Sequence, residues 1–189
     1  MVGIRRKKFI IQVMGVNNGL IETPDLVLFW GGPLSNFYEA PYQVVLGDGR
    51  TVTMNCTEKH FMYIKAMTFG DKVTGEKILL APTPGKAKAL GRKVQGYDDN
   101  VWSEVRYNVM LEVNLLKYRN NAGVRDTLLK KNWRNKHFVE ASPYDKIWGI
   151  GLNMDDPRSY DPSQWEGQNL LGKCLDEVRE ILLEEEAYR

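Results

Sequence analysis

One segment of this chain is apolar on nearly every side of the helix that it would form. Residues 61–64 read Phe-Met-Tyr-Ile, and Ala66 and Met67 follow after one lysine. A helix of this kind is buried, so the rest of the chain has to pack around residues 58–68. We expect Thr57 to cap the start of this helix. The 189 residues, 43% of them hydrophobic, suffice for one soluble domain built around it.

The other patterns predict an α+β fold, a mostly helical single domain with a few short antiparallel strands. A Gly-Asp-Gly turn between two β-like runs predicts a hairpin over residues 42–54. Apolar stripes at helical spacing mark two long helices, one of them with Trp102, Val105 and Val109 on its inner face. We divide the chain into an N-terminal extension, residues 1–25, with the first strand, and a domain, residues 26–189. The predicted strands are 8–14, 26–30, 137–140 and 145–150, the helices 84–93, 102–116, 124–131 and 169–187, and a polar loop covers 155–167.

Composition excludes several classes of protein. Two cysteines, Cys56 and Cys174, cannot form a disulfide framework, and no apolar run is long enough to cross a membrane. The basic start of the chain leads into a short apolar run without a small-residue cleavage site, so we expect a cytoplasmic protein. His60 and His137 have no ligand-like neighbours, and no dinucleotide or phosphate-loop motif occurs. We therefore expect neither a metal nor a cofactor.

The net charge of +2 is an average over unlike segments. Residues 77–97 contain five basic side chains and no acid, and residues 117–137 contain seven basic side chains and one acid. If both segments flank a pocket, a polyphosphate or a modified nucleic-acid strand is a reasonable ligand. If they lie on the far side, a small metabolite is favoured.

Two segments suggest where chemistry could occur. Glu58 and Lys65 are two helical turns apart on one face, about 10 Å along the axis, and ionised groups on a buried surface are costly unless they are paired or functional. Alternatively, Glu58 lies at a solvated first turn and Lys65 extends outward. In the second segment, Glu140 and Asp145 precede Trp148 and Gly149, as in a ligand wall with close backbone approach. The alternative there is an acid-rich loop with a structural tryptophan.

Two further segments carry weaker signals. Asn169 begins the last helix, where it either helps to bind an anion or only caps the helix. The turn at Gly31 and Gly32 lies between Phe29 and Phe37. It either accepts a flat base by stacking or packs over the core.

These motifs occur in an order that closely resembles the NADAR family, the YbiA-like N-glycosidases, over residues 29–180. The matching motifs are, in order, Gly31-x-Pro33-Leu-Ser-Asn36-Phe37, Glu58 with Lys65, Ala-Leu-Gly91-Arg92, Trp102 with Asn108-Val-Met110, Leu116-Lys117-Tyr118, Leu128-Leu129, Glu140-x-Ser-Pro-x-Asp145-x-x-Trp148-Gly149-x-Gly151, and Trp165-x-Gly-x-Asn169-x-Leu171-Gly172 with Val178-Arg179.

The resemblance implies cleavage of a C–N bond at C1 of a ribose. Two substrate classes are associated with the family: ADP-ribose on a guanine base, in a nucleoside, DNA or RNA, and the ribosylamino-pyrimidine phosphates of riboflavin synthesis. Lys65 matches the family's helix lysine and would form a Schiff base with the opened sugar. Glu58 or Asp145 would move a proton or stabilise the cation. The residues expected to contact substrate are Phe29, Gly31, Gly32, Asn36, Arg92, Trp148, Gly149 and Asn169.

The chain departs from the family pattern at two positions. Lys59 follows Glu58 where the family usually has histidine, and Met62 occupies a position often held by glutamine. These differences leave two non-enzymatic alternatives open. One is a module that binds ADP-ribose or a nucleotide without turnover, and the weaker one is a structural partner protein.

Overall fold

A computed structural model describes residues 15–17 and 19–188 of the chain. Four strands, β1 (Gly15–Asn17), β2 (Leu20–Glu22), β3 (Leu26–Phe29) and β6 (His137–Glu140), form a sheet in the order β1-β2-β3-β6. The first three strands are antiparallel, whereas β3 and β6 pair in parallel with Val27 opposite Phe138. The strand predicted at residues 8–14 lies outside the described residues.

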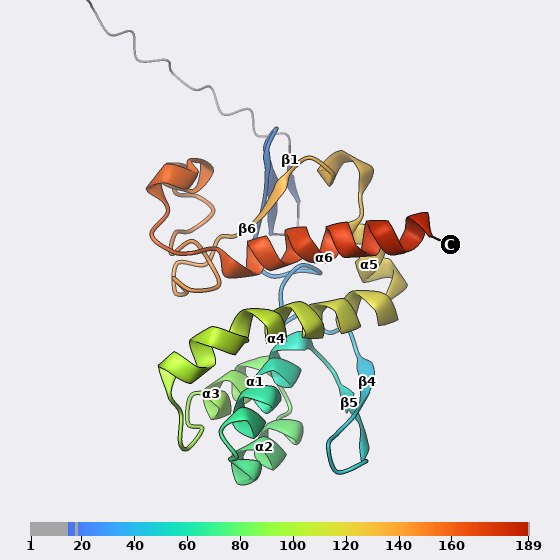
Figure 1. Ribbon diagram of the computed structural model, residues 1–189. Helices are drawn as coiled ribbons and strands as arrows, with labels where there is room; N and C mark the ends of the chain where they lie inside the picture. Colours follow the sequence, from blue (N-terminus) through green and yellow to red (C-terminus); the bar gives the residue numbers. More distant parts are fainter. Residues whose placement is uncertain (1–14, 18, 189) are drawn as a thin grey trace, which may run out of the picture.

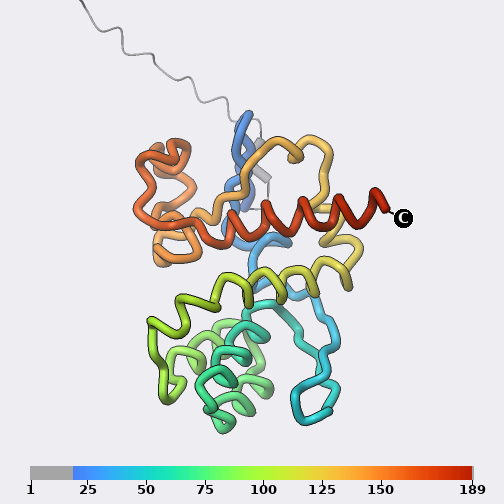
Figure 2. The backbone as a smooth tube through the Cα atoms, in the orientation of Figure 1, coloured from blue at the N-terminus to red at the C-terminus, as the bar shows by residue number. Residues whose placement is uncertain are grey.

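The second sheet is the predicted hairpin, β4 (Tyr42–Val45) with β5 (Thr51–Met54). Six α-helices are described: α1 (Thr57–Thr68), α2 (Lys72–Leu79), α3 (Pro84–Gly91), α4 (Asp99–Asn120), α5 (Ala122–Leu128) and α6 (Leu170–Ala187). In Figure 1 the four-stranded sheet lies at one end, α6 crosses beside it, and α4 runs next to α6. The tube in Figure 2 shows α1, α2 and α3 grouped with the hairpin at the opposite end.

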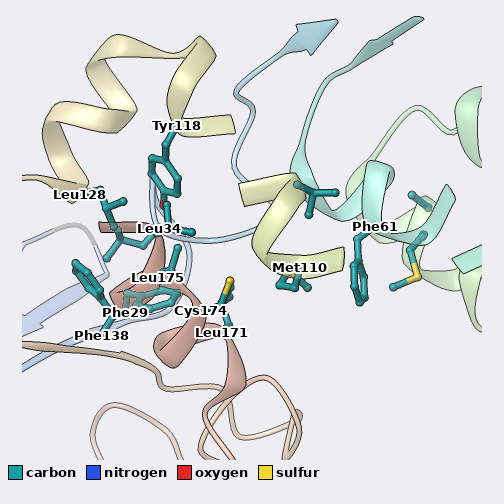
Figure 3. Close-up of a cluster of buried hydrophobic side chains, with 14 of the residues drawn as sticks. Phe29, Leu34, Phe61, Met110, Tyr118, Leu128, Phe138, Leu171, Cys174 and Leu175 are labelled. Carbon is teal, nitrogen blue, oxygen red and sulfur yellow. The ribbon is translucent and has the colours of Figure 1, made fainter. Parts of the chain in front are cut away.

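The core runs through these layers. Leu171, Leu175, Val178 and Leu182, the predicted inner stripe of α6, are completely buried. Figure 3 shows Phe29 and Phe138 against α6, with Met110 of α4 lying between that group and Phe61 of α1. The core therefore connects the sheet to α1, as the apolar character of α1 requires. The α+β class is confirmed.

Three local predictions need correction. Helix α1 begins at Thr57, with Cys56 rather than Thr57 as its cap residue. Residues 145–150 form a bent, irregular segment instead of a strand, because the Asp145 carboxylate accepts the backbone N–H groups of Ile147 and Trp148 that a strand would direct to a neighbour. The 155–167 loop contains two short 3₁₀ helices, Pro157–Tyr160 and Pro162–Gln164.

Helix α2 was not predicted, because Ile78 is its only buried large apolar side chain and no periodic stripe exists. The Asp71 side chain caps this helix by accepting the Thr74 N–H at 3.0 Å. Gly75 allows α2 to approach α1 closely, since a Cβ there would lie 2.4 Å from Cε of Met67. Of the helices that the structure describes, none is long and apolar enough to cross a membrane.

Candidate active site

A cavity of about 560 Å³ lies between α1, α3, α4 and the loop that follows β6. Helices α1 and α4 provide an apolar wall of Phe61, Met62, Trp102 and Met110. The loop before the hairpin adds residues 35–37. Charged side chains from separate parts of the chain face the same space: Glu58, Lys65, Lys88, Arg92, Arg106, Glu140, Asp145 and Lys146.

Helix α1 places Glu58 at the inner end of this cavity. Only 4% of Glu58 is exposed, and its backbone N–H donates to the Asn36 carbonyl at 3.0 Å. Its Oε1 atom has no hydrogen-bond partner among the described residues. Burial raises the pKa of Glu58 to about 7. This burial excludes the alternative of a solvated first turn.

Lys65 lies in the last turn of α1 and is half-buried. Its Nζ atom lies 3.9 Å from the centroid of the Tyr97 ring, a cation–π contact. Burial lowers the pKa of Lys65, although the Asp99 carboxylate opposes the shift. A lowered pKa increases the fraction of neutral amine, which is the form that attacks a carbon atom.

Two more carboxyl groups lie near Glu58. Glu140 ends β6, and its buried Oε2 atom has no hydrogen-bond partner among residues 15–17 and 19–188. Burial, reinforced by the neighbouring Asp145 carboxylate, raises the pKa of Glu140 to about 8. Asp145 is paired instead: Oδ1 accepts the backbone N–H groups of Ile147 and Trp148, and Oδ2 lies 3.5 Å from Nζ of Lys88. Carboxyl groups that keep a proton near neutral pH, beside one that is paired, are suited to acid–base chemistry.

The charges divide the cavity into two ends. The pKa of Glu58 responds to Lys88, Asp145 and Arg92, whereas that of Lys65 responds to Asp99 and Arg92. Arg92 therefore acts on both groups. We call the part around Glu58, Glu140 and Asp145 the carboxyl end, and the part around Lys65 and Tyr97 the amine end.

Buried polar groups of α4 hold the loop that carries Asn36. The Lys117 ammonium is completely buried and donates to the carbonyls of Pro33 at 2.7 Å and Ser35 at 2.9 Å. The Asn36 side chain accepts from Asn114 at 3.3 Å and approaches Sδ of Met110 at 3.1 Å through its Nδ2 atom. The loop position thus depends on side chains about 80 residues later in the chain.

Replacing Lys117 by methionine should destabilise the protein by about 2 kcal/mol. The Pro33 and Ser35 carbonyls would lose their shortest hydrogen bonds and keep longer ones, from the Tyr118 hydroxyl at 3.4 Å and from the Tyr38 N–H at 3.2 Å. Urea unfolding of Lys117→Met against the wild-type protein measures this loss. Lys93→Met is the matched control, since Lys93 is exposed. Equal midpoints for the two variants would show that the loop is held by other contacts.

Six predicted site residues face the cavity together. They come from the 35–37 loop, α1, the end of α3 and the loop after β6: Asn36, Glu58, Lys65, Arg92, Asp145 and Trp148. The Trp148 ring contacts Phe61 edge-on, with centroids 5.3 Å apart. The remaining predicted residues lie elsewhere.

Phe29 does not lie on the cavity wall. It is completely buried in the core, because β3 is covered on both faces. Gly31 and Gly32 have positive φ angles of 91° and 63° and make the turn that leads to Asn36. The idea that Phe29 stacks on the ligand is therefore corrected, whereas Gly31 and Gly32 lie outside the cavity wall and shape the turn before it.

Asn169 and Gly149 support the carboxyl end from behind. Asn169 is buried; its Oδ1 accepts the Glu140 N–H at 3.0 Å, and its Nδ2 donates to the Phe138 carbonyl at 2.9 Å. Its side-chain amide is thus engaged by β6 instead of by a ligand. A Cβ at Gly149 would lie 2.8 Å from the Glu140 carbonyl oxygen, so only glycine fits behind that residue.

The sequence patterns assign no site role to Lys88, Tyr97 or Arg106, which line the cavity. They place Glu140 in a candidate ligand wall after a strand end, but they give it no catalytic role. Lys88 and Arg106 resemble any exposed helix cations in sequence. Only the packing of α3 and α4 beside α1 brings them together.

The two basic segments have different surroundings. Lys88 and Arg92, from residues 77–97, line the cavity. In residues 117–137, Arg119 pairs with Glu185, Arg125 with Glu186 at 2.8 Å, and Lys136 with Glu22 at 3.1 Å. The acidic C-terminal helix thus pairs with two of the seven cations of the second segment. The two basic segments therefore do not both flank the cavity, and they do not both lie away from it.

Comparisons with known proteins identify the family. The model of the NADAR domain matches residues 28–183. The chain is 39% identical over 168 residues to the N-glycosidase R617 of Acanthamoeba polyphaga mimivirus, covering 85% of this chain and 98% of that protein. It is 37% identical over 181 residues to the protein irg-1 of Caenorhabditis elegans, covering 89% and 84%.

The fold is also similar to that of a solved structure. The NMR structure of the E. coli protein YbiA superposes with a TM-score of 0.65 at 26% identity, covering 88% of this chain and 89% of that one. The family match extends over most of the described fold and includes α1, α3, α4 and β6. The chain therefore belongs to the NADAR domain family, and its enzyme class is that of the N-glycosidases.

Proposed function

We propose that this enzyme removes ADP-ribose from guanine bases by cleaving the N-glycosidic bond at C1 of the ribose, with Lys65 as the nucleophile. The observation that carries the proposal is a half-buried amine of lowered pKa in a cavity that also holds buried, partly unpartnered carboxyl groups. An oxocarbenium-like sugar is favoured near carboxylates. A neutral amine next to such a sugar can form a covalent intermediate.

The proposed reaction has two balanced steps. In the first, the Lys65 nitrogen bonds to C1, the C1–N bond to the base breaks, and a proton from Glu58 reaches the departing base. The lysine nitrogen then passes a proton to the ring oxygen as the C1–O bond of the ring breaks, which leaves a protonated Schiff base and a hydroxyl at C4. In the second, water adds to C1 and gives a proton to Glu58, the new C1 hydroxyl passes its proton to the nitrogen as the C1–N bond breaks, and Lys65 leaves as the free amine. The C4 hydroxyl then closes the ring on the C1 aldehyde. The products are the free base and the sugar with a hydroxyl at C1.

The two-ended cavity accommodates this sequence. Because Glu58 and Lys65 are two turns apart on α1, the base extends from the amine end toward the carboxyl end and is protonated at its far edge. Asp145, fixed by Lys88 and two amides at the carboxyl end, adds to burial in raising the pKa of Glu58 and so favours the protonated acid that the base needs. Arg92 and Arg106 provide the charge for phosphate groups, with Asn36 and Trp148 against the sugar or base.

A ribosylamino-pyrimidine phosphate is the second candidate substrate. The observation that favours it is that the cavity lining includes Lys88 and Arg92 of the first basic segment and no residue of 117–137, where three cations pair with carboxylates. Fewer cations suit a single phosphate better than a long strand.

Borohydride trapping tests the proposal with both substrates. The enzyme is incubated with an ADP-ribosylated guanine nucleoside or with the ribosylamino-pyrimidine phosphate, with and without borohydride, and then digested for mass spectrometry. We expect base release from the guanine substrate and a reduced sugar adduct on the peptide that contains Lys65. Release without an adduct on Lys65 would overturn the Schiff-base route, and release from the pyrimidine substrate alone would overturn the choice of substrate.

A further inference from the structure

Aromatic side chains gather at the mouth of the cavity, although exposed aromatic surface is costly in water. Tyr144 is 85% exposed, and Phe37 is 43% exposed; both line the cavity. Trp30 is 47% exposed and contacts Tyr144, with ring centroids 6.1 Å apart. We call Trp30, Phe37 and Tyr144 the aromatic rim. Trp30 itself is not a lining residue, so the rim extends beyond the cavity.

The rim continues directly into charged groups at the carboxyl end. The Lys88 ammonium lies 5.5 Å from the centroid of the Phe37 ring and 3.5 Å from the Asp145 carboxylate. Asp145 follows Tyr144 in the chain. Exposed rings beside a cation bind bases and phosphates together, since bases stack on aromatic faces and the cation attracts the backbone.

We propose that the aromatic rim binds a second nucleobase, one that the ligand carries outside the cavity. This inference rests on the proposed function, because the ribosyl group fills the cavity while the rim holds a base attached to it through phosphates. The substrate is then an extended, nucleotide-like molecule. A single ribosyl-pyrimidine phosphate has one ring and no second base to place on the rim.

The second base has two sources, the adenine of ADP-ribose itself or a neighbouring base of a nucleic-acid strand. Their shared chemistry is a flat heteroaromatic ring next to a phosphate. Binding measurements separate them without any turnover, so a failure of the glycosidase proposal does not affect the result. The probes are ADP-ribose, ribose 5-phosphate and a short single-stranded DNA.

The experiment compares the wild-type enzyme with Tyr144→Ala and Trp30→Phe by calorimetry and tryptophan fluorescence. We expect Tyr144→Ala to weaken binding of ADP-ribose, of the DNA or of both by about tenfold, the scale of stacking on one ring, and to leave ribose 5-phosphate unchanged. The probe whose binding weakens identifies the source of the base. Trp30→Phe should reduce the fluorescence change that this probe causes, and Trp102 and Trp148 of the cavity wall account for the remainder.

Tyr188→Ala is the matched control, because Tyr188 is 91% exposed at the end of α6 and is absent from the cavity wall. Tyr144 is exposed to a similar degree, so its replacement leaves the fold intact. Equal loss for all three probes would overturn the proposal, because the rim would then act on the ribosyl cavity. Unchanged binding of ADP-ribose and DNA in Tyr144→Ala would overturn it as well.

Discussion

Replacing Lys65 by arginine will abolish base release and leave the protein folded. Arginine keeps the positive charge and can remain over the Tyr97 ring, which Lys65 contacts at 3.9 Å. It cannot form a Schiff base, because the guanidinium stays protonated. We expect kcat/KM to fall by at least about a thousandfold, since loss of a covalent nucleophile costs up to about a millionfold. Steady-state kinetics with the substrate identified by trapping measure the effect.

Lys93→Arg is the matched control and should retain wild-type kinetics, since Lys93 is exposed beyond α3 and does not line the cavity. Lys88 is the alternative candidate for the nucleophile. Its Nζ lies 3.5 Å from the Asp145 carboxylate, and its charge lowers the pKa of Glu58. In Lys88→Arg the borohydride adduct should still form on Lys65. An adduct that forms on the Lys88 peptide of the wild-type enzyme, with Lys65→Arg still active, would assign the nucleophile to Lys88.

The sequence predicted the elements whose buried apolar side chains recur at regular spacing. The inner stripe of α6 is an example, because Leu171, Leu175 and Val178 are all completely buried. Helix α4 was located, but its buried face was misjudged. Val105 is 36% exposed, whereas Asn114 and Lys117 are completely buried. A hydrophobic pattern cannot reveal buried polar side chains, and these two hold the loop that carries Asn36.

The candidate site was predictable only within single segments. Glu58 and Lys65 could be placed together because helical spacing relates them. Lys88 and Glu140 join them through the packing of α3 on α1 and of β6 beside β3, which no local pattern encodes. Phe29 and Asn169 show the opposite error. Motif order placed them at the site, but Phe29 fills the core and the Asn169 amide holds β6.

The pH dependence of stability should reveal the cost of burying Glu58 and Glu140. Their pKa values in the folded protein are about 7 and about 8, against 4.5 for an ordinary glutamate. The folded state therefore binds protons more tightly than the unfolded state between these values. The free energy of unfolding is highest below about pH 4.5 for these two groups, and it falls as the pH rises through 7 and 8.

Glu58→Gln and Glu140→Gln should consequently be more stable than the wild-type protein at alkaline pH. Each removes a carboxylate that is ionised inside the cavity, a gain on the order of 2 kcal/mol at about pH 9 that disappears near pH 5. Urea unfolding at the two pH values measures the difference. Glu104→Gln is the matched control, because Glu104 is exposed on α4. A gain that is equal at both pH values would contradict the origin in ionisation.

The same substitutions should cost activity, which links the instability to function. If protonated Glu58 delivers the proton to the base, kcat/KM of the wild-type enzyme declines above about pH 7. In Glu58→Gln we expect a loss of 10²- to 10⁴-fold, roughly the contribution of a general acid, and the alkaline decline should vanish. Glu140→Gln distinguishes the two carboxyls: if it, and not Glu58→Gln, removes the decline, Glu140 is the acid. A carboxyl that destabilises the fold and yet contributes nothing to the rate would contradict the proposed role of the carboxyl end.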